Sequence, residues 1–198
     1  DSFQKNYHRI YRVVTSDKFG DGQTFNSGIP VPALKSLQAE IPQVRFAPLF
    51  AAYGTQVTVP SATSQTGNKF VEETGIFFSE PQFFDVFDYK WLAGNPSVLN
   101  EPNSMVLARK TALKYFGNWE QAMGQTILLA NAVSMKVNGI IEDVPANSDF
   151  PLYLVGSFQT ARTHADLFYL YDYWKSTSSN FHIYALLPEQ AKAADIDN

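Results

Sequence analysis

Hydrophobic side chains are densest in residues 83–94, where only three charged residues interrupt the large apolar and aromatic ones. Three phenylalanines at relative positions i, i+1 and i+4 would share one face of a short helix: Phe83, Phe84 and Phe87. Pro81 suits the first turn of such a helix. Residues 89–93 then alternate as in a strand, and Gly94 ends the run. We expect this stretch to be buried.

A second apolar block follows after a polar loop. Residues 104–108 contain four consecutive hydrophobic residues after Ser104 and predict a buried strand. Residues 109–116 predict a helix whose apolar face contains Ala112, Leu113 and Phe116. Gly117 suits the left-handed position just beyond a helix end.

Patterns elsewhere predict a further helix and several short strands. Pro32 begins the helix, Leu34, Leu37 and Ile41 lie on one stripe, and Pro42 ends it. Before residue 83 we expect strands at residues 7–14, 44–52, 56–59 and 69–78 and a loop at 15–29. Residues 60–68 are expected to be a hairpin loop or locally disordered. Pro48 inside residues 44–52 indicates an edge strand or a bulge.

The second half of the chain predicts a hairpin and a long helix. Residues 126–129 and 134–141 are predicted to pair across a short link, and strands are expected at 152–158 and 181–187. Residues 160–173 have the length of a helix that is apolar almost all round. The aromatic residues from Phe168 to Trp174 are interpreted as core, and the alternative is an exposed surface that contacts a partner or stacks on sugars.

Composition excludes some classes of protein. The 198 residues allow one large domain or two small ones, and cysteine is absent. A net charge of -4 argues against nucleic-acid binding, which needs clustered basic residues. No apolar run reaches the roughly 18 residues that would span a bilayer. Because the sequence begins at Asp1 and stops at Asn198, we expect it to be part of a longer protein.

Residues with catalytic or ligand chemistry do not form a known motif. His8, His164 and His182 are far apart and lack metal-ligand spacing. Asp85 and Asp88 could share a helix face, but solvent exposure explains them more simply. The acidic residues Glu142, Asp143 and Asp149 lack the alternating ligands of a calcium loop. Ser2 and Ser157 lack the companions of a nucleophile motif, and no phosphate loop is present. We therefore expect no catalytic residues, metal or cofactor.

Several of these segments, in this order and spacing, resemble the MacB-like periplasmic core domain of bacterial MacB/FtsX-type ABC transporter permeases. The similar segments are residues 9–13, 83–87, 92–96, 103–107, 112–117, 123–126 and 137–148. Together they span most of the chain. The structural core that the resemblance implies comprises Phe83, Phe84, Phe87, Gly94, Leu113, Phe116 and Gly117. Asp149 departs from the family, in which a histidine is expected after Asn147-Ser148.

The resemblance implies an α+β fold with two lobes. A porter-like strand-helix-strand subdomain (residues 1–55 plus 150–198) would be interrupted by a small inserted α/β subdomain (residues 56–149). It also implies a non-catalytic domain outside the cytoplasmic membrane, between the first two transmembrane helices of a dimeric permease. The expected partners are a cytoplasmic ATPase and a periplasmic adaptor protein, and the cargo would be large or amphiphilic. The alternative is an extracytoplasmic sensor that binds a small ligand.

Overall fold

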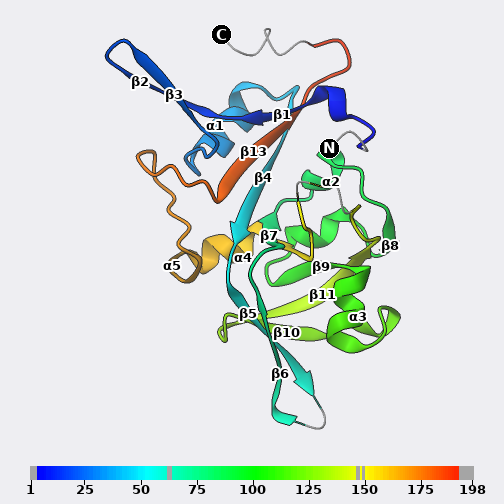
Figure 1. Ribbon diagram of the computed structural model, residues 1–198. Coiled ribbons are helices and arrows are strands. Elements are labelled where there is room, and N and C mark those ends of the chain that lie inside the picture. Colours follow the sequence, from blue (N-terminus) through cyan, green and yellow to red (C-terminus); the bar gives the residue numbers. More distant parts are fainter. Residues whose placement is uncertain (1–3, 62–63, 146–147, 149, 192–198) are drawn as a thin grey trace.

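The computed structural model describes residues 4–61, 64–145, 148 and 150–191 (Figure 1). Its mixture of one large sheet and short helices confirms the predicted α+β class. The α-helices are α1 (Ala33–Glu40), α2 (Phe83–Val86), α3 (Arg109–Phe116), α4 (Phe158–Thr163) and α5 (Ala165–Phe168). The 3-10 helices are η1 (Tyr7–Arg9), η2 (Pro96–Asn100) and η3 (Glu120–Ala122).

Eleven strands of the described residues form one sheet. Ten of them follow the order β1-β13-β4-β7-β12-β9-β11-β10-β5-β6, and β8 pairs with β11 beside this path. The strands at the amino-terminal end of the chain are β1 (Ile10–Val13), β4 (Arg45–Ala52), β5 (Thr55–Ser61), β6 (Ser64–Glu72) and β7 (Ile76–Ser79). The others are β8 (Trp91–Ala93), β9 (Ser104–Ala108), β10 (Thr126–Leu129), β11 (Val133–Ile141), β12 (Leu154–Ser157) and β13 (Phe181–Leu186).

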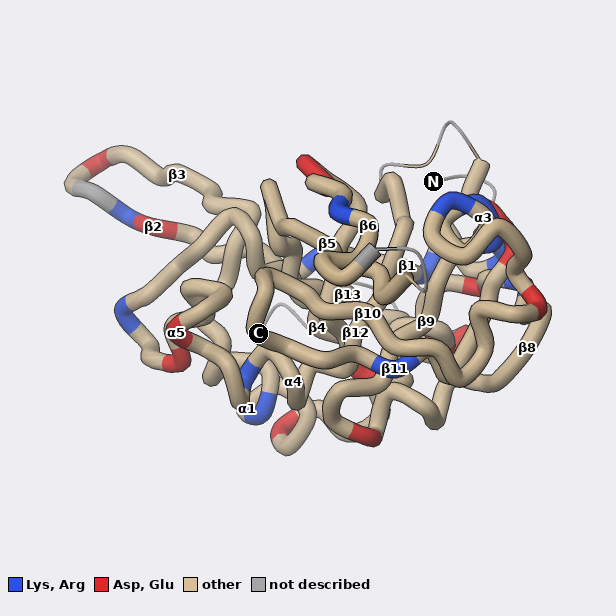
Figure 2. Tube along the Cα trace, turned by 90° about the horizontal axis from the view of Figure 1, so that it is seen from below, with Lys and Arg blue, Asp and Glu red and all other residues tan. Residues whose placement is uncertain are grey.

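The central strands β4, β7, β12 and β9 are buried on both faces, and strand alternation divides the core in two. In β4, Phe46 and Phe50 belong to a cluster with residues of α1, α3 and α4, whereas Ala47 and Leu49 belong to a cluster with residues of α2. Successive side chains of a strand point to opposite faces, so β4 contributes to both clusters. Strands β5, β7, β9, β10, β12 and β13 contain no Lys, Arg, Asp or Glu. Figure 2 shows charged residues around α3, on the β2–β3 hairpin and near α1 and α5.

The division into a subdomain of residues 1–55 plus 150–198 and an inserted subdomain of residues 56–149 remains a prediction. In the sheet, β12 from the predicted outer segments lies between β7 and β9 of the predicted insertion, parallel to β7 and antiparallel to β9. Strand β4 is hydrogen bonded to β13 on one side and to β7 on the other. Backbone hydrogen bonds therefore join the two segments directly.

The first 29 residues differ from the prediction in two places. Residues 15–29 are not a loop throughout, because β2 (Thr15–Phe19) and β3 (Gly22–Asn26) form a hairpin that projects from the rest of the molecule (Figure 1). The side chains of β3 are mostly exposed, so its sequence lacks the alternation that marks a half-buried strand. Residues 7–9 of the predicted first strand form η1, and pairing starts only at Ile10.

Pro48 does not mark an edge, because β4 is an inner strand of the sheet. The Pro48 carbonyl oxygen accepts a hydrogen bond from the Ser79 hydroxyl, so the edge of the Pro48 backbone that carries N and C=O faces β7. Pairing between β4 and β7 begins only at the next residue, with Leu49 opposite Ser79. The missing N–H of proline therefore leaves no β7 partner unsatisfied.

Two predicted boundaries between strand and loop are also wrong. Residues 60–61 and 64–68 belong to the strands of the β5–β6 hairpin rather than to its loop, since β5 continues to Ser61 and β6 begins at Ser64, and residues 62–63 lie outside the described residues. Residues 69–78 are not one strand, because β6 ends at Glu72 and β7 begins at Ile76. Between them Gly75 has a φ of 85°, which breaks an extended chain. The predicted hairpin of β10 and β11 is confirmed, and Ala130 and Asn131 at its turn both have positive φ.

Candidate functional site

The predicted core residues around α2 lie in a tightly packed aromatic cluster. Phe83 and Phe87 have ring centroids 5.0 Å apart, and Phe84 lies 4.7 Å from Trp91 of β8. We use the name aromatic cluster for seven residues from five parts of the chain: Phe83, Phe84, Phe87, Tyr89, Trp91, Phe150 and Tyr184. The Phe87 ring lies 5.2 Å from Tyr184 of β13 and 5.5 Å from Phe150, so this one residue joins α2 to two distant segments.

The aromatic cluster is electrically neutral. Tyr89 is buried, and burial, with the neighbouring Tyr184 as a second cause, raises the pKa of its phenol far above the ordinary value of about 10. Asp85, which is on the same short helix, points outward and forms an ion pair with Arg45 at 3.5 Å. Apart from this exposed ion pair to β4, apolar and aromatic packing attaches α2 to the sheet.

Gly94 occupies a position that only glycine fills without strain. Its φ is 77°, and an added Cβ would overlap with the carbonyl oxygen of Asn138 on β11. The loop after β8 can therefore lie directly against the neighbouring strand.

Helix α3 lies where it was predicted, and Gly117 ends it in the left-handed conformation with a φ of 76°. Its buried face, however, contains Thr111, Ala112 and Tyr115. Leu113 is 42% exposed, so its predicted place in the core is wrong, and Phe116 is only partly buried against the core. Tyr115 takes the inward position because its hydroxyl has a buried partner.

That partner is Glu72 at the end of β6. The Glu72 side chain is 5% exposed, and its Oε1 accepts hydrogen bonds from Tyr115 Oη at 2.7 Å and Lys114 Nζ at 2.6 Å. Burial, together with the Glu72 carboxylate, raises the pKa of Tyr115 well beyond its ordinary range. A buried carboxylate needs such partners to offset its desolvation. One charged group therefore fixes α3 to the edge strand of the sheet.

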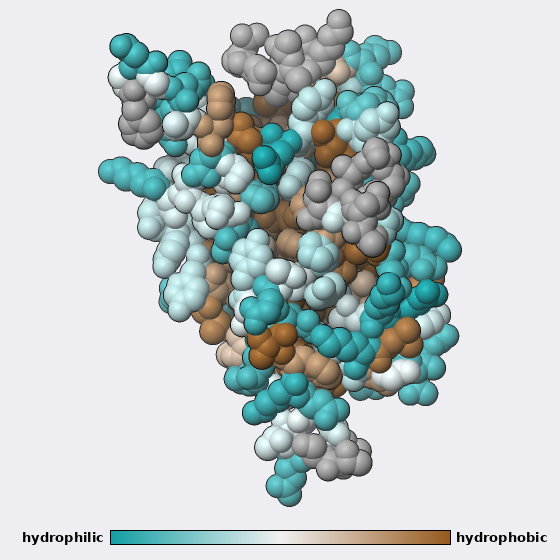
Figure 3. All heavy atoms as spheres, viewed as in Figure 1, coloured by the Kyte–Doolittle hydropathy of each residue, from teal (hydrophilic) through white to brown (hydrophobic). Residues whose placement is uncertain are grey.

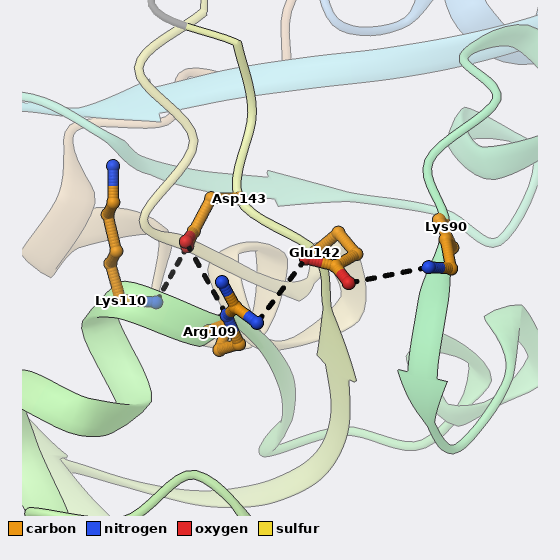
Figure 4. Close-up of polar contacts among 5 residues, drawn as sticks. All are labelled: Lys90, Arg109, Lys110, Glu142 and Asp143. Atoms are coloured by element: carbon orange, nitrogen blue, oxygen red, sulfur yellow. Dashed lines mark hydrogen bonds and ion pairs between the residues drawn. The ribbon is translucent and has the colours of Figure 1, made fainter.

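The start of α3 is capped from a distant part of the chain (Figure 4). Ala108 at the N-cap position has no side chain that could accept a hydrogen bond, and Asp143 Oδ1 instead accepts one from the Lys110 backbone N–H at 2.7 Å. Arg109 bridges Asp143 at 3.7 Å and Glu142 at 3.9 Å, and Lys90, directly before β8, reaches Glu142 at 3.4 Å. Two of the three acidic residues of the predicted cluster therefore stabilise a helix start, and Asp149 lies outside the described residues.

The aromatic segment after α4 is mostly at the surface, contrary to the prediction. The predicted helix at residues 160–173 is two short helices, which end where Tyr169 adopts positive φ. Phe168 and Leu170 are buried, but Tyr169, Tyr173 and Trp174 are 72%, 55% and 60% exposed. The surface over this segment, at the left of Figure 3, has intermediate hydropathy. Amphipathic rings can be exposed in this way because their polar atoms stay hydrated.

The residues with catalytic or ligand chemistry are not brought together. The three histidines lie on η1, between α4 and α5, and on β13, and the described part of the chain contains no group of three potential metal ligands. Asp85 and Asp88 are exposed, and the Ser157 hydroxyl is buried and donates to the Leu99 carbonyl oxygen at 2.8 Å. Ser2 lies outside the described residues. None of the described helices is long and apolar enough to cross a membrane.

Comparison with protein families identifies the domain. The MacB-like periplasmic core domain matches residues 1–198, the whole chain. The chain belongs to this family. Like the family, it is an extracytoplasmic domain of a membrane protein, and the expected resemblance is confirmed. A search of curated proteins finds no match.

Solved structures show the MacB-like fold in two proteins. A domain of a protein assigned as a permease, from Porphyromonas gingivalis, is similar with a TM-score of 0.73 and 19% identity over 98% of this chain and 82% of that one. The periplasmic region of MacB from Actinobacillus actinomycetemcomitans has a TM-score of 0.66 and 15% identity over 100% and 85% of the two chains. At these identities the likeness establishes the fold.

Proposed function

We propose that this domain is the extracytoplasmic part of a MacB/FtsX-type ABC transporter permease and passes movement from the membrane helices to partners outside. ATP hydrolysis at a cytoplasmic ATPase would drive the movement, and a second permease copy would complete the transporter. A periplasmic adaptor is the expected outside partner. Membership of the MacB-like periplasmic core domain family supports this role.

The observation that carries the proposal is the way in which α2 is fixed to the sheet. The aromatic cluster has no charged member, and its rings contact β8, β13 and the segment before β12. Packed interiors resist compression and transmit displacement, so a domain fixed in this way moves as one body. The buried Glu72 contacts fix the other face through α3.

We further propose that the domain has no catalytic centre and no cofactor of its own. The histidines and carboxylates of the described residues lie apart or pair with basic side chains. The cargo would be large or amphiphilic, such as an antimicrobial peptide, a macrolide or a lipoprotein. Export would follow from movement of the domain pair.

The test compares the complete permease with a form in which residues 1–198 are replaced by a short linker, each reconstituted with its ATPase. We expect the shortened form to hydrolyse ATP but to lose export of whichever peptide, macrolide or lipoprotein the intact complex exports. Export that persists without the domain would contradict the proposal. The complete reading frame provides a simple check, because an apolar run of about 20 residues must precede the domain.

A further inference from the structure

A cleft of about 460 Å³ lies beside the aromatic cluster, between β1, β13 and the segment that leads into η1. This volume is in the range of pockets that enclose small molecules, roughly 300–1,000 Å³. Phe87, Phe150 and Tyr184 of the aromatic cluster form its apolar wall. The cleft therefore begins where the packed core ends.

Strand geometry explains why polar groups also face this cleft. Arg12 of β1 lies directly opposite Tyr184 of β13 in the antiparallel ladder, so their side chains share one face of the sheet. His182 lies two residues before Tyr184 and therefore points to the same face. Arg12 and His182 both line the cleft.

Gln4 contributes a buried donor group without a partner. The residue is 2% exposed, and its Oε1 accepts a hydrogen bond from the Asp88 backbone N–H at 2.7 Å. Because a backbone N–H can only donate, this contact fixes which end of the amide is oxygen. The Nε2 group is buried and has no hydrogen-bond partner among the described residues. A buried amide in this state costs free energy unless a ligand satisfies it.

One more group at the cleft, Arg12, favours an anion. Arg12 makes no ion pair with any described carboxylate. His182 Nε2 is buried and likewise lacks a partner among the residues that the structure describes. Burial, and secondly the positive charge of Arg12, lowers the pKa of His182, which shows that the guanidinium acts on this side of the cleft.

We propose that the cleft binds a small amphiphilic carboxylate, with its head group on Arg12 and Gln4 Nε2 and its apolar body against Phe87, Phe150 and Tyr184. A guanidinium and an amide donor both match carboxylate oxygens, and the aromatic wall favours an apolar chain or ring. This site goes beyond the transmission role and does not depend on it. It would give the domain a ligand that stabilises the contact between β1, β13 and α2.

The test uses 4-phenylbutyrate and decanoate as probes of the purified chain, with binding measured by calorimetry and by nitrogen-proton NMR. We expect saturable binding, and we expect the side-chain amide signals of Gln4 to shift on titration. The uncharged 4-phenylbutyramide should bind at least about tenfold more weakly, as expected for loss of one charge-assisted contact. Arg12→Gln should weaken carboxylate binding by a similar factor. Arg45→Gln, which removes a guanidinium outside the cleft, should leave binding unchanged.

Gln4→Glu provides a second variant, because its carboxylate can still accept from the Asp88 N–H while the donor is lost. This variant should also weaken carboxylate binding by at least about tenfold, and circular dichroism should show an unchanged fold. The proposal is wrong if neither probe binds saturably up to about 10 mM, a concentration at which even a weak site fills. It is also wrong if the amide binds as well as the acid, if inorganic phosphate binds as tightly as 4-phenylbutyrate, or if Arg12→Gln binds normally.

Discussion

Helices α2 and α3 belong to the two core clusters of the same sheet, yet different forces fix them in place. Helix α2 has only four residues, and its rings pack against neutral aromatic rings from four other parts of the chain. Helix α3 has eight residues, exposes Leu113, and depends on Glu72 beneath it and Asp143 at its start. The comparison indicates that the shorter helix relies on many aromatic contacts, whereas the two-turn helix adds polar contacts at its start and edge to the burial of Ala112 and Tyr115.

The largest effect should come from removing one ring of the aromatic cluster. Phe83 is fully buried, so Phe83→Ala leaves a cavity and should lower the free energy of unfolding by about 3–5 kcal/mol. Leu113→Ala on α3 is the matched control and should cost less than about 1 kcal/mol, because Leu113 is 42% exposed. Chemical denaturation measures both values. Equal losses for the two variants would refute the contrast between the helices.

The second effect concerns the charged group under α3. Glu72→Ala leaves the buried Tyr115 hydroxyl without an acceptor and should cost about 2 kcal/mol. Glu72→Gln keeps an acceptor for that hydroxyl and should cost less. Urea unfolding at low and at high salt checks both variants. If Glu72→Ala is as stable as the natural chain, packing rather than this contact fixes α3.

Both regions should lose stability at alkaline pH through their buried tyrosines. The folded pKa values of Tyr89 and Tyr115 are raised above the ordinary value of about 10. The contribution of each neutral phenol to the free energy of unfolding is therefore fully present below pH 10 and is lost as pH rises further. Each group should lower the free energy of unfolding by about 1.4 kcal/mol per pH unit above that point. Urea unfolding between pH 9 and 11.5 tests this slope. Tyr115→Phe should reduce the slope, whereas Tyr171→Phe, at an exposed site, should not.

The smallest effect should follow loss of the distant cap. Asp143→Ala removes the acceptor for the Lys110 N–H and should cost about 1 kcal/mol. Asp88→Ala, which removes an exposed carboxylate beside α2, should cost almost nothing. Thermal melting compares the two variants. Equal melting temperatures would show that the Asp143 contact does not stabilise α3.

The sequence predicted those features that depend on neighbouring residues. The bounds of α3, the left-handed Gly117 after it and the β10–β11 hairpin all follow from local periodicity and turn chemistry. The cap at α3 could not be predicted, because Asp143 is 33 residues from Lys110 in the sequence. The edge strand predicted from Pro48 was wrong for a similar reason. Only the register between β4 and β7 shows that no β7 group needs the hydrogen bond that proline cannot donate.

Aromatic residues were the least predictable, because the same side chains suit core and surface. Phe83 and Phe87 are buried, whereas Tyr171, Tyr173 and Trp174 are exposed, and hydrophobic content alone does not separate the two groups. The hydroxyl and indole N–H groups of the exposed set are the physical difference, since they remain hydrated at the surface. The cleft at Gln4 was not predicted either, because its groups come from separate segments.

The central claim is that the domain moves as one body, and pulsed spin-label distance measurement in the complete transporter tests it most directly. The chain contains no cysteine, so labels at the exposed positions Ala39→Cys on α1 and Lys69→Cys on β6 are specific within it. With one protomer doubly labelled, the distance between these labels should stay the same when ATP binds. Labels at Lys69→Cys in both copies should instead change their separation. A shift of several ångströms within one domain on ATP binding would contradict the rigid-body account.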